Sequence, residues 1–246
     1  MLRKILLFCG IISSLLYVTI NIVVPTQFPG YSSVSQTVSE LSAIDAPTRP
    51  LWVLLCIFYS LLIIAFGWGA LRSAGRNRPL RVIAVLLIAY GISGLFWPPM
   101  HQRGNKMSLT DTMHIVFAIA TVILMLLAIG FGAAAFGRQF RYYSILTIIM
   151  LLVFGGLTGM DGPRIAANLP TPMVGVWERI SIGFFLLWII VFAIILLKAE
   201  TSGGSLTAVT HDTLRGKVSG DRQRSKMKQA IFKLFISFLL CCSAKT

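Results

Sequence analysis

Long uncharged apolar runs alternate with short polar stretches along the chain. A helical run of about 17–25 apolar residues can cross a bilayer core of roughly 30 Å. Such a helix satisfies its own backbone hydrogen bonds without water. We therefore expect an all-α, polytopic membrane protein whose main domain, residues 1–198, is a bundle of six transmembrane helices. The runs predict spans near residues 5–24, 51–71, 82–97, 112–136, 144–160 and 180–197.

Proline and serine mark the polar connections between these runs. Pro98 and Pro99 follow the third run, and proline disfavours helix in the residue before it. Residues 25–50 are rich in proline and serine, which predicts an irregular connection after the first span. A short helix around residues 34–43 is expected inside that connection.

The last part of the chain, residues 199–246, differs from the rest in being polar and basic. We expect it to be a cytoplasmic tail. Near its end, residues 229–243 are apolar but interrupted by Lys233. This pattern predicts an amphipathic helix that lies on the inner leaflet. A seventh span is the alternative.

Composition excludes a soluble domain. The chain is 56% hydrophobic and 12% charged, whereas soluble domains carry about 25% charged residues. The net charge of +14 is explained by cytoplasmic loops and by attraction to anionic lipids. Because no nucleic-acid motif accompanies this charge, we expect membrane lipids as partners and no nucleic acid.

The distribution of Lys and Arg predicts the orientation. Six spans place both chain ends on one side, and the side richer in Lys and Arg is cytoplasmic. We therefore expect a multi-pass protein of the bacterial plasma (inner) membrane, with both termini in the cytoplasm. The residues that support this orientation are Arg3, Lys4, Arg72, Arg76, Arg78, Arg81, Arg138, Arg141 and Lys198.

The stretch from Phe96 to His114 holds two of the three histidines, and it also contains Asp111. Imidazole and carboxylate groups are ligands that zinc uses, so His101, Asp111 and His114 are a candidate metal site. Alternatively, Ser108 and Asp111 have the spacing of a helix capping box. His114, about one turn inside an apolar run, is then a hydrogen-bonded packing residue.

Ionisable groups gather in the connections predicted to face outward. Such groups near a membrane boundary are candidates for function. The alternative for the residues after Trp177 is an interfacial anchor, because tryptophan is enriched at that depth. The candidates for the rim of a ligand pocket are Glu40, His101, Asp111, His114, Glu178 and Arg179.

Three segments carry a resemblance to a known family: PGYSSVSQTVSELSAIDAPTRPLW after the first run, then FWPPMH, then TDTMH. Together they resemble the bacterial membrane family called domain of unknown function 998, over roughly residues 5–198. The resemblance implies six helices with a structured first outer connection, and it implies no established activity. A more distant likeness is to DRAM/Sfk-type six-helix membrane proteins, which implies a lipid-associated role.

Three hypotheses for function remain open. The first is non-catalytic binding of a lipid or small apolar ligand in an outward-facing polar pocket. The second is an intramembrane hydrolase with zinc at His101, Asp111 and His114 and with Glu178 or Glu40 as the base. The third is a small transporter, which is disfavoured because no span carries a charged residue at mid-depth.

Overall fold

The computed structural model describes residues 1–105 and 107–201. Six of its helices, α1 to α5 and α7, are long and apolar enough to cross a membrane, which confirms the predicted all-α membrane bundle. The predicted features beyond residue 201, including the helix at residues 229–243, lie outside the described residues. The elements are α1 (Leu2–Val23), η1 (Val24–Gln27), η2 (Val38–Ser42), α2 (Arg49–Ser73), α3 (Arg78–Leu95), α4 (Leu109–Ala135), α5 (Arg138–Met160), α6 (Gly162–Ala166) and α7 (Val174–Thr201).

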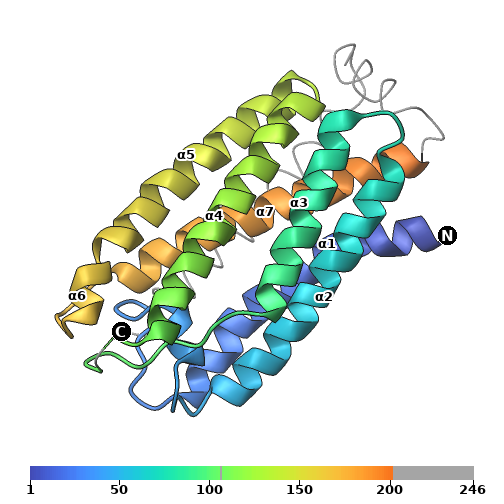
Figure 1. Cartoon of the computed structure of the whole chain (residues 1–246). Helices are drawn as coiled ribbons and strands as arrows, with labels where there is room; N and C mark the ends of the chain where they lie inside the picture. Colours follow the sequence, from blue (N-terminus) through green and yellow to red (C-terminus); the bar gives the residue numbers. More distant parts are fainter. Residues whose placement is uncertain (106, 202–246) are drawn as a thin grey trace, which may run out of the picture.

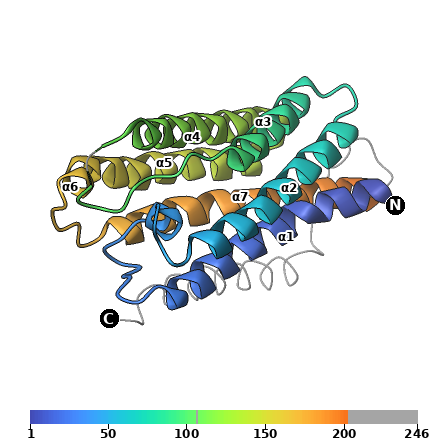
Figure 2. The same ribbon diagram turned by 60° about the horizontal axis from the view of Figure 1, so that its bottom comes forward.

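The six long helices form a closed ring. Each one packs against its neighbours in the order α1, α2, α3, α4, α5 and α7, and α7 packs against α1 to close the ring (Figures 1 and 2). An ion pair between Arg3 and Glu200 (Nη2 to Oε1, 2.5 Å) joins the start of α1 to the end of α7. The two ends of the described bundle therefore lie at the same end of the ring.

Several helices begin before the apolar runs because polar residues stabilise their first turns. Asn77 precedes α3, and its side-chain oxygen accepts a hydrogen bond from the Leu80 backbone N–H (3.1 Å). This helix consequently starts before residue 82, where the apolar pattern begins. At the start of α4, Ser108 and Asp111 form the predicted capping box.

Aromatic rings fill the centre of the bundle. Trp188 and Phe192 on α7 stack with their ring centres 5.1 Å apart, and Phe66 on α2 meets Phe192 edge-on at 5.6 Å. The Trp188 indole N–H, which needs a partner when buried, donates to the Ser144 hydroxyl (3.0 Å). The outward faces are also apolar, as a bilayer requires. Examples on α4 and α5 are Ile115, Ile119, Ile123, Ile145 and Leu152.

The first connection, residues 24–48, folds back over the start of α7. The Gly175 backbone N–H donates to the Val34 carbonyl oxygen (3.0 Å). A Cβ atom at Gly175 would collide with the backbone oxygens of Ser33 and Gln36. Only glycine permits this close approach, so α7 sets the position of the first connection.

We predict that Gly175→Ala destabilises the protein by about 1–3 kcal/mol, because the first connection must move to accommodate the methyl group. Detergent-dependent unfolding followed by circular dichroism measures this change. Gly159→Ala is the matched control, because a Cβ atom there would meet nothing within 4 Å. Equal losses in the two variants would contradict the tight contact.

Candidate functional site

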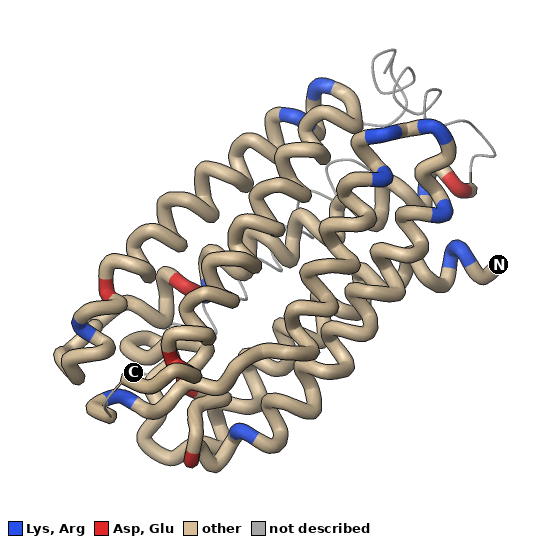
Figure 3. The backbone as a smooth tube through the Cα atoms, viewed as in Figure 1, with Lys and Arg blue, Asp and Glu red and all other residues tan. Residues whose placement is uncertain are grey.

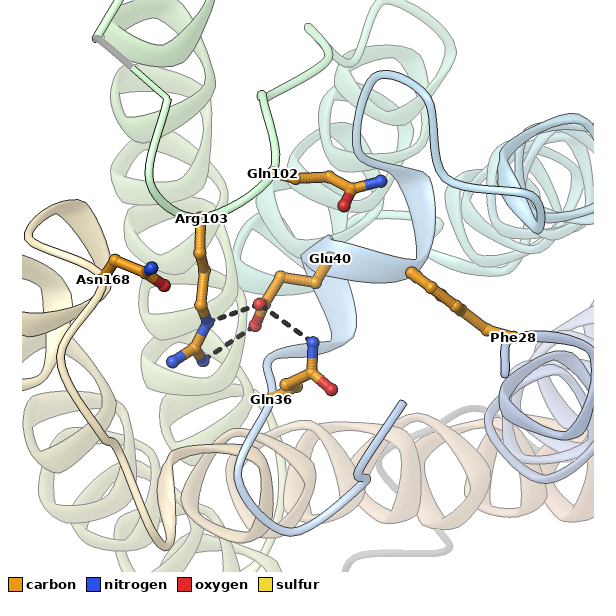
Figure 4. A pocket seen from close by; sticks show the side chains of 6 residues that line it. All are labelled: Phe28, Gln36, Glu40, Gln102, Arg103 and Asn168. Atoms are coloured by element: carbon orange, nitrogen blue, oxygen red, sulfur yellow. Dashed lines mark hydrogen bonds and ion pairs between the residues drawn. The ribbon is translucent and has the colours of Figure 1, made fainter. Parts of the chain in front are cut away.

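Three connections meet at the end of the bundle opposite the Arg3–Glu200 ion pair: residues 24–48, 96–108 and 161–173. We call this the loop-rich end. It contains a cavity of about 220 Å³, to which all three connections contribute side chains. As Figure 4 shows, the lining residues are Phe28, Gln36, Glu40, Gln102, Arg103 and Asn168.

A bidentate ion pair between Glu40 and Arg103 forms one wall of this cavity. The guanidinium Nε lies 2.5 Å from Oε1, and Nη2 lies 2.9 Å from Oε2. The Glu40 side chain is only 4% exposed and that of Arg103 only 15%. Two charges with this little contact with water depend on each other, because either one left alone would carry the full desolvation penalty.

Glu40 is held in place by its own helix as well as by arginine. Thr37 and Glu40 form a capping box at the start of η2. The carboxylate accepts from the Thr37 backbone N–H (2.6 Å) and from the Thr37 hydroxyl (3.0 Å). The Gln36 side-chain amide donates to its other oxygen (3.3 Å). Both carboxylate oxygens thus accept hydrogen bonds from several donors, which fixes the orientation of the side chain.

Arg103 joins all three connections. Its Nη2 donates to the Ser35 carbonyl oxygen (2.9 Å), and its Nη1 donates to the Thr171 hydroxyl (2.7 Å). The Thr171 hydroxyl in turn donates to the same Ser35 oxygen (2.9 Å). With Glu40, these contacts tie the second connection to both the first and the third.

Arg179, predicted at the pocket rim, instead anchors the first connection from inside. This side chain is 1% exposed, and its Nη1 donates to the carbonyl oxygens of Ser33 (2.9 Å) and Gln36 (3.2 Å). Its Nη2 donates to the Tyr31 hydroxyl (2.7 Å). Burial raises the pKa of Tyr31 above its ordinary value, although the nearby guanidinium lowers it. The protonated hydroxyl donates to the Thr37 carbonyl oxygen (2.8 Å).

Glu178, the residue before Arg179, also holds the first connection against α7. Its Oε2 accepts from the Val38 backbone N–H (2.5 Å) at the start of η2. A carboxylate is well placed there, because the first N–H groups of a helix have no partner within the helix. This bond ties η2 directly to α7.

His101, Asp111 and His114 are divided between two separate interactions. Asp111 accepts from the His101 backbone N–H (2.7 Å) and lies 2.9 Å from the His101 Nδ1. The buried His114 donates from Nδ1 to the Pro98 carbonyl oxygen (2.8 Å) and packs edge-on against Trp97. Within residues 1–105 and 107–201, no group of three or more His, Cys, Asp or Glu side chains could hold a metal ion. The three candidate zinc ligands are therefore not gathered around one point.

Two carboxamide side chains on the cavity wall have no hydrogen-bond partner among the described residues. Gln102 belongs to the second connection and Asn168 to the third. Neither side chain forms a hydrogen bond with the described part of the chain. Each amide therefore keeps two N–H donors and a carbonyl acceptor available.

The comparison with family models matches residues 11–195 to the family described as "Protein of unknown function (DUF998)". This match covers most of the 246 residues. The chain belongs to the DUF998 family. The comparisons with curated proteins and with solved structures give no match. The likeness to DRAM/Sfk-type proteins stays a prediction.

Of the six pocket candidates in this DUF998 chain, Glu40 alone lines the cavity. Asp111, Glu178 and Arg179 bond to neighbouring backbone and loop groups instead. The other five lining residues were not among the predicted candidates. Arg103 had one signal, a cation in a connection predicted to lie on the same side of the membrane as Glu40. The amides and Phe28 had none.

We predict that Arg103→Ala lowers the free energy of unfolding of the DUF998 protein by about 3–5 kcal/mol, because Glu40 is left buried without its partner. Unfolding in graded denaturing detergent measures the loss. Arg164→Ala is the control, because the Arg164 side chain is 52% exposed and makes a 3.9 Å contact with Asp161 and one hydrogen bond, from Nε to the Pro170 carbonyl oxygen (3.0 Å), but no buried ion pair. A loss for Arg103→Ala no larger than that of the control would show that the pair does not stabilise the loop-rich end.

Proposed function

We propose that this DUF998 protein is a non-catalytic membrane protein that binds a lipid through its polar headgroup in the cavity at the loop-rich end. The proposal rests mainly on one observation. The cavity presents the unengaged amides of Gln102 and Asn168 beside an ion pair, Glu40 with Arg103, whose charges already satisfy each other. Convergent polar groups around a small concave space are typical of a binding site.

The acidic groups at this end support binding more than catalysis. A general base must be free to accept a proton from its substrate. Glu40 is bonded to Arg103, Asp111 to His101, and Glu178 to a backbone N–H. Each of these three carboxylates therefore has a structural partner that a substrate would have to replace.

The position of the cavity favours a lipid. It lies where the ends of the spans meet the connections, the depth at which lipid headgroups are found. Acyl chains could then lie along the apolar outer faces of the helices. Five of the six lining residues are polar, and Phe28 is the exception. This lining suits a headgroup better than a wholly apolar ligand.

For the cellular location we propose the bacterial plasma membrane, with both termini in the cytoplasm. Arg3 and Glu200 place the two ends of the described bundle on one side. Lys and Arg crowd that end in Figure 3, while the loop-rich end carries fewer of them beside acidic residues. The positive-inside rule then supports an outward-facing cavity.

The orientation predicts which sites an impermeant reagent reaches. In a cysteine-free background, a membrane-impermeant maleimide applied to whole cells should label Asn105→Cys, in the second connection, and should not label Arg76→Cys, between α2 and α3. Both positions are exposed. Labelling of Arg76→Cys but not of Asn105→Cys would show that the orientation is the opposite of the proposed one.

The binding proposal predicts that removing both free amides lowers lipid occupancy. Native mass spectrometry of protein purified in mild detergent should show a bound lipid, and Gln102→Ala with Asn168→Gly should reduce its occupancy by about tenfold. Glycine is chosen because Asn168 has φ of 54°, a conformation that alanine disfavours. Gln27→Ala with Asn105→Ala, two exposed amides outside the cavity, is the matched control. Equal occupancy in all three proteins would refute the proposal.

A further inference from the structure

We propose that the group bound in this cavity is neutral and rich in hydroxyls, as a sugar or glycerol headgroup is. This inference rests on the proposed binding function and names the chemical class of its ligand. It draws on three properties of the cavity wall: its charge balance, its free donors and acceptors, and its aromatic side.

Charge balance disfavours an ionic ligand. The Arg103 guanidinium is already paired with both oxygens of Glu40, at 2.5 and 2.9 Å. A phosphate could bind Arg103 only by displacing the Glu40 carboxylate, whose side chain is 4% exposed. Glu40 would then be a buried charge without a partner, which is strongly disfavoured. A cation could bind Glu40 only by separating its carboxylate from Arg103, which would leave the guanidinium without a partner. A neutral ligand leaves the pair intact.

The unpaired donors and acceptors of the cavity wall are suited to hydrogen bonds with hydroxyl groups. Gln102 and Asn168 each present a carbonyl oxygen and an NH₂ group with no partner in the described residues. A hydroxyl both donates and accepts, so one hydroxyl can use either end of an amide. A phosphate dianion only accepts, so the amide oxygens would face it without a hydrogen bond. Arg103 adds a donor, because Nη1 has a second N–H beyond the one that contacts Thr171.

The Phe28 ring gives the cavity wall one apolar side. One face of its ring stacks on Tyr31, with ring centres 5.7 Å apart and planes 26° apart. Figure 4 shows Phe28 and Asn168 on opposite sides of the Glu40–Arg103 pair. A sugar ring has polar edges and an apolar C–H face, which suits the Asn168 amide on one side and the Phe28 ring on the other, with Gln102 between them in the same view.

The size of the cavity sets an upper limit on the ligand. Its volume of about 220 Å³ lies below the range of about 300–1,000 Å³ that is typical of sites for drug-sized ligands. One headgroup of a single ring therefore fits, and acyl chains must remain outside. A free sugar of the same size has the same chemistry, so the test must distinguish the two sources.

The experiment uses the full-length protein in phosphatidylcholine nanodiscs. Three probes are titrated and followed by native mass spectrometry: monoglucosyl diacylglycerol, phosphatidic acid and free glucose. We expect the glucolipid to bind about tenfold more tightly than phosphatidic acid. Gln102→Ala with Asn168→Gly should lose this preference, and Gln27→Ala with Asn105→Ala should keep it. Circular dichroism confirms that each variant is folded, and each pocket substitution is also tested singly.

Each outcome separates this inference from the function on which it rests. Glucose that competes fully with the glucolipid identifies a site for the sugar itself, and weak competition identifies a lipid site; both support the hydroxyl chemistry. Tighter binding of phosphatidic acid, lost in the pocket variant, would overturn the inference and leave the binding function standing. Glucolipid binding that the pocket variant leaves unchanged would place the lipid elsewhere and overturn the inference. No binding of any probe would overturn it too, and the occupancy measurement on co-purified lipid then decides the binding function separately.

Discussion

The loop-rich end depends on one buried ion pair. Glu40 comes from a short helix in the first connection and Arg103 from the second, and neither connection belongs to a span. Through its remaining donors Arg103 also contacts Ser35 and Thr171, so a single guanidinium links all three connections. A bidentate charged contact has both the strength and the fixed geometry for this task. The cavity is a consequence of that assembly.

Buried polar groups at a membrane boundary need not be a functional site. Arg179 and Glu178 face the first connection and satisfy its carbonyl and N–H groups, which makes them part of its support. The cavity that remains is lined in part by the side-chain amides of Gln102 and Asn168, which form no hydrogen bond in this network. All six lining residues, from Phe28 to Asn168, fall within the region that matches the DUF998 family. The cavity therefore lies within the part of the chain that matches the family.

The sequence predicts the bundle well because span length and apolarity are local properties, as is the Ser108–Asp111 capping box. It also predicts that His114, one turn inside an apolar run, needs a hydrogen-bond partner, although not that the partner is the Pro98 carbonyl oxygen. The cavity is different. Glu40 and Arg103 are distant in sequence, and their contact depends on how the connections fold over the ring. Amides such as Gln102 have no distinctive spacing, so only the assembled structure identifies them.

The most direct test of this account is a double-mutant cycle on the ion pair. The free energy of unfolding is measured for the wild type, Glu40→Gln, Arg103→Gln and the double variant. We predict a coupling energy of about 1.5–3 kcal/mol, with the double variant losing less than the sum of the single variants, because each single change leaves one buried charge without a partner. Losses that add to within about 0.5 kcal/mol would contradict the central role of the pair.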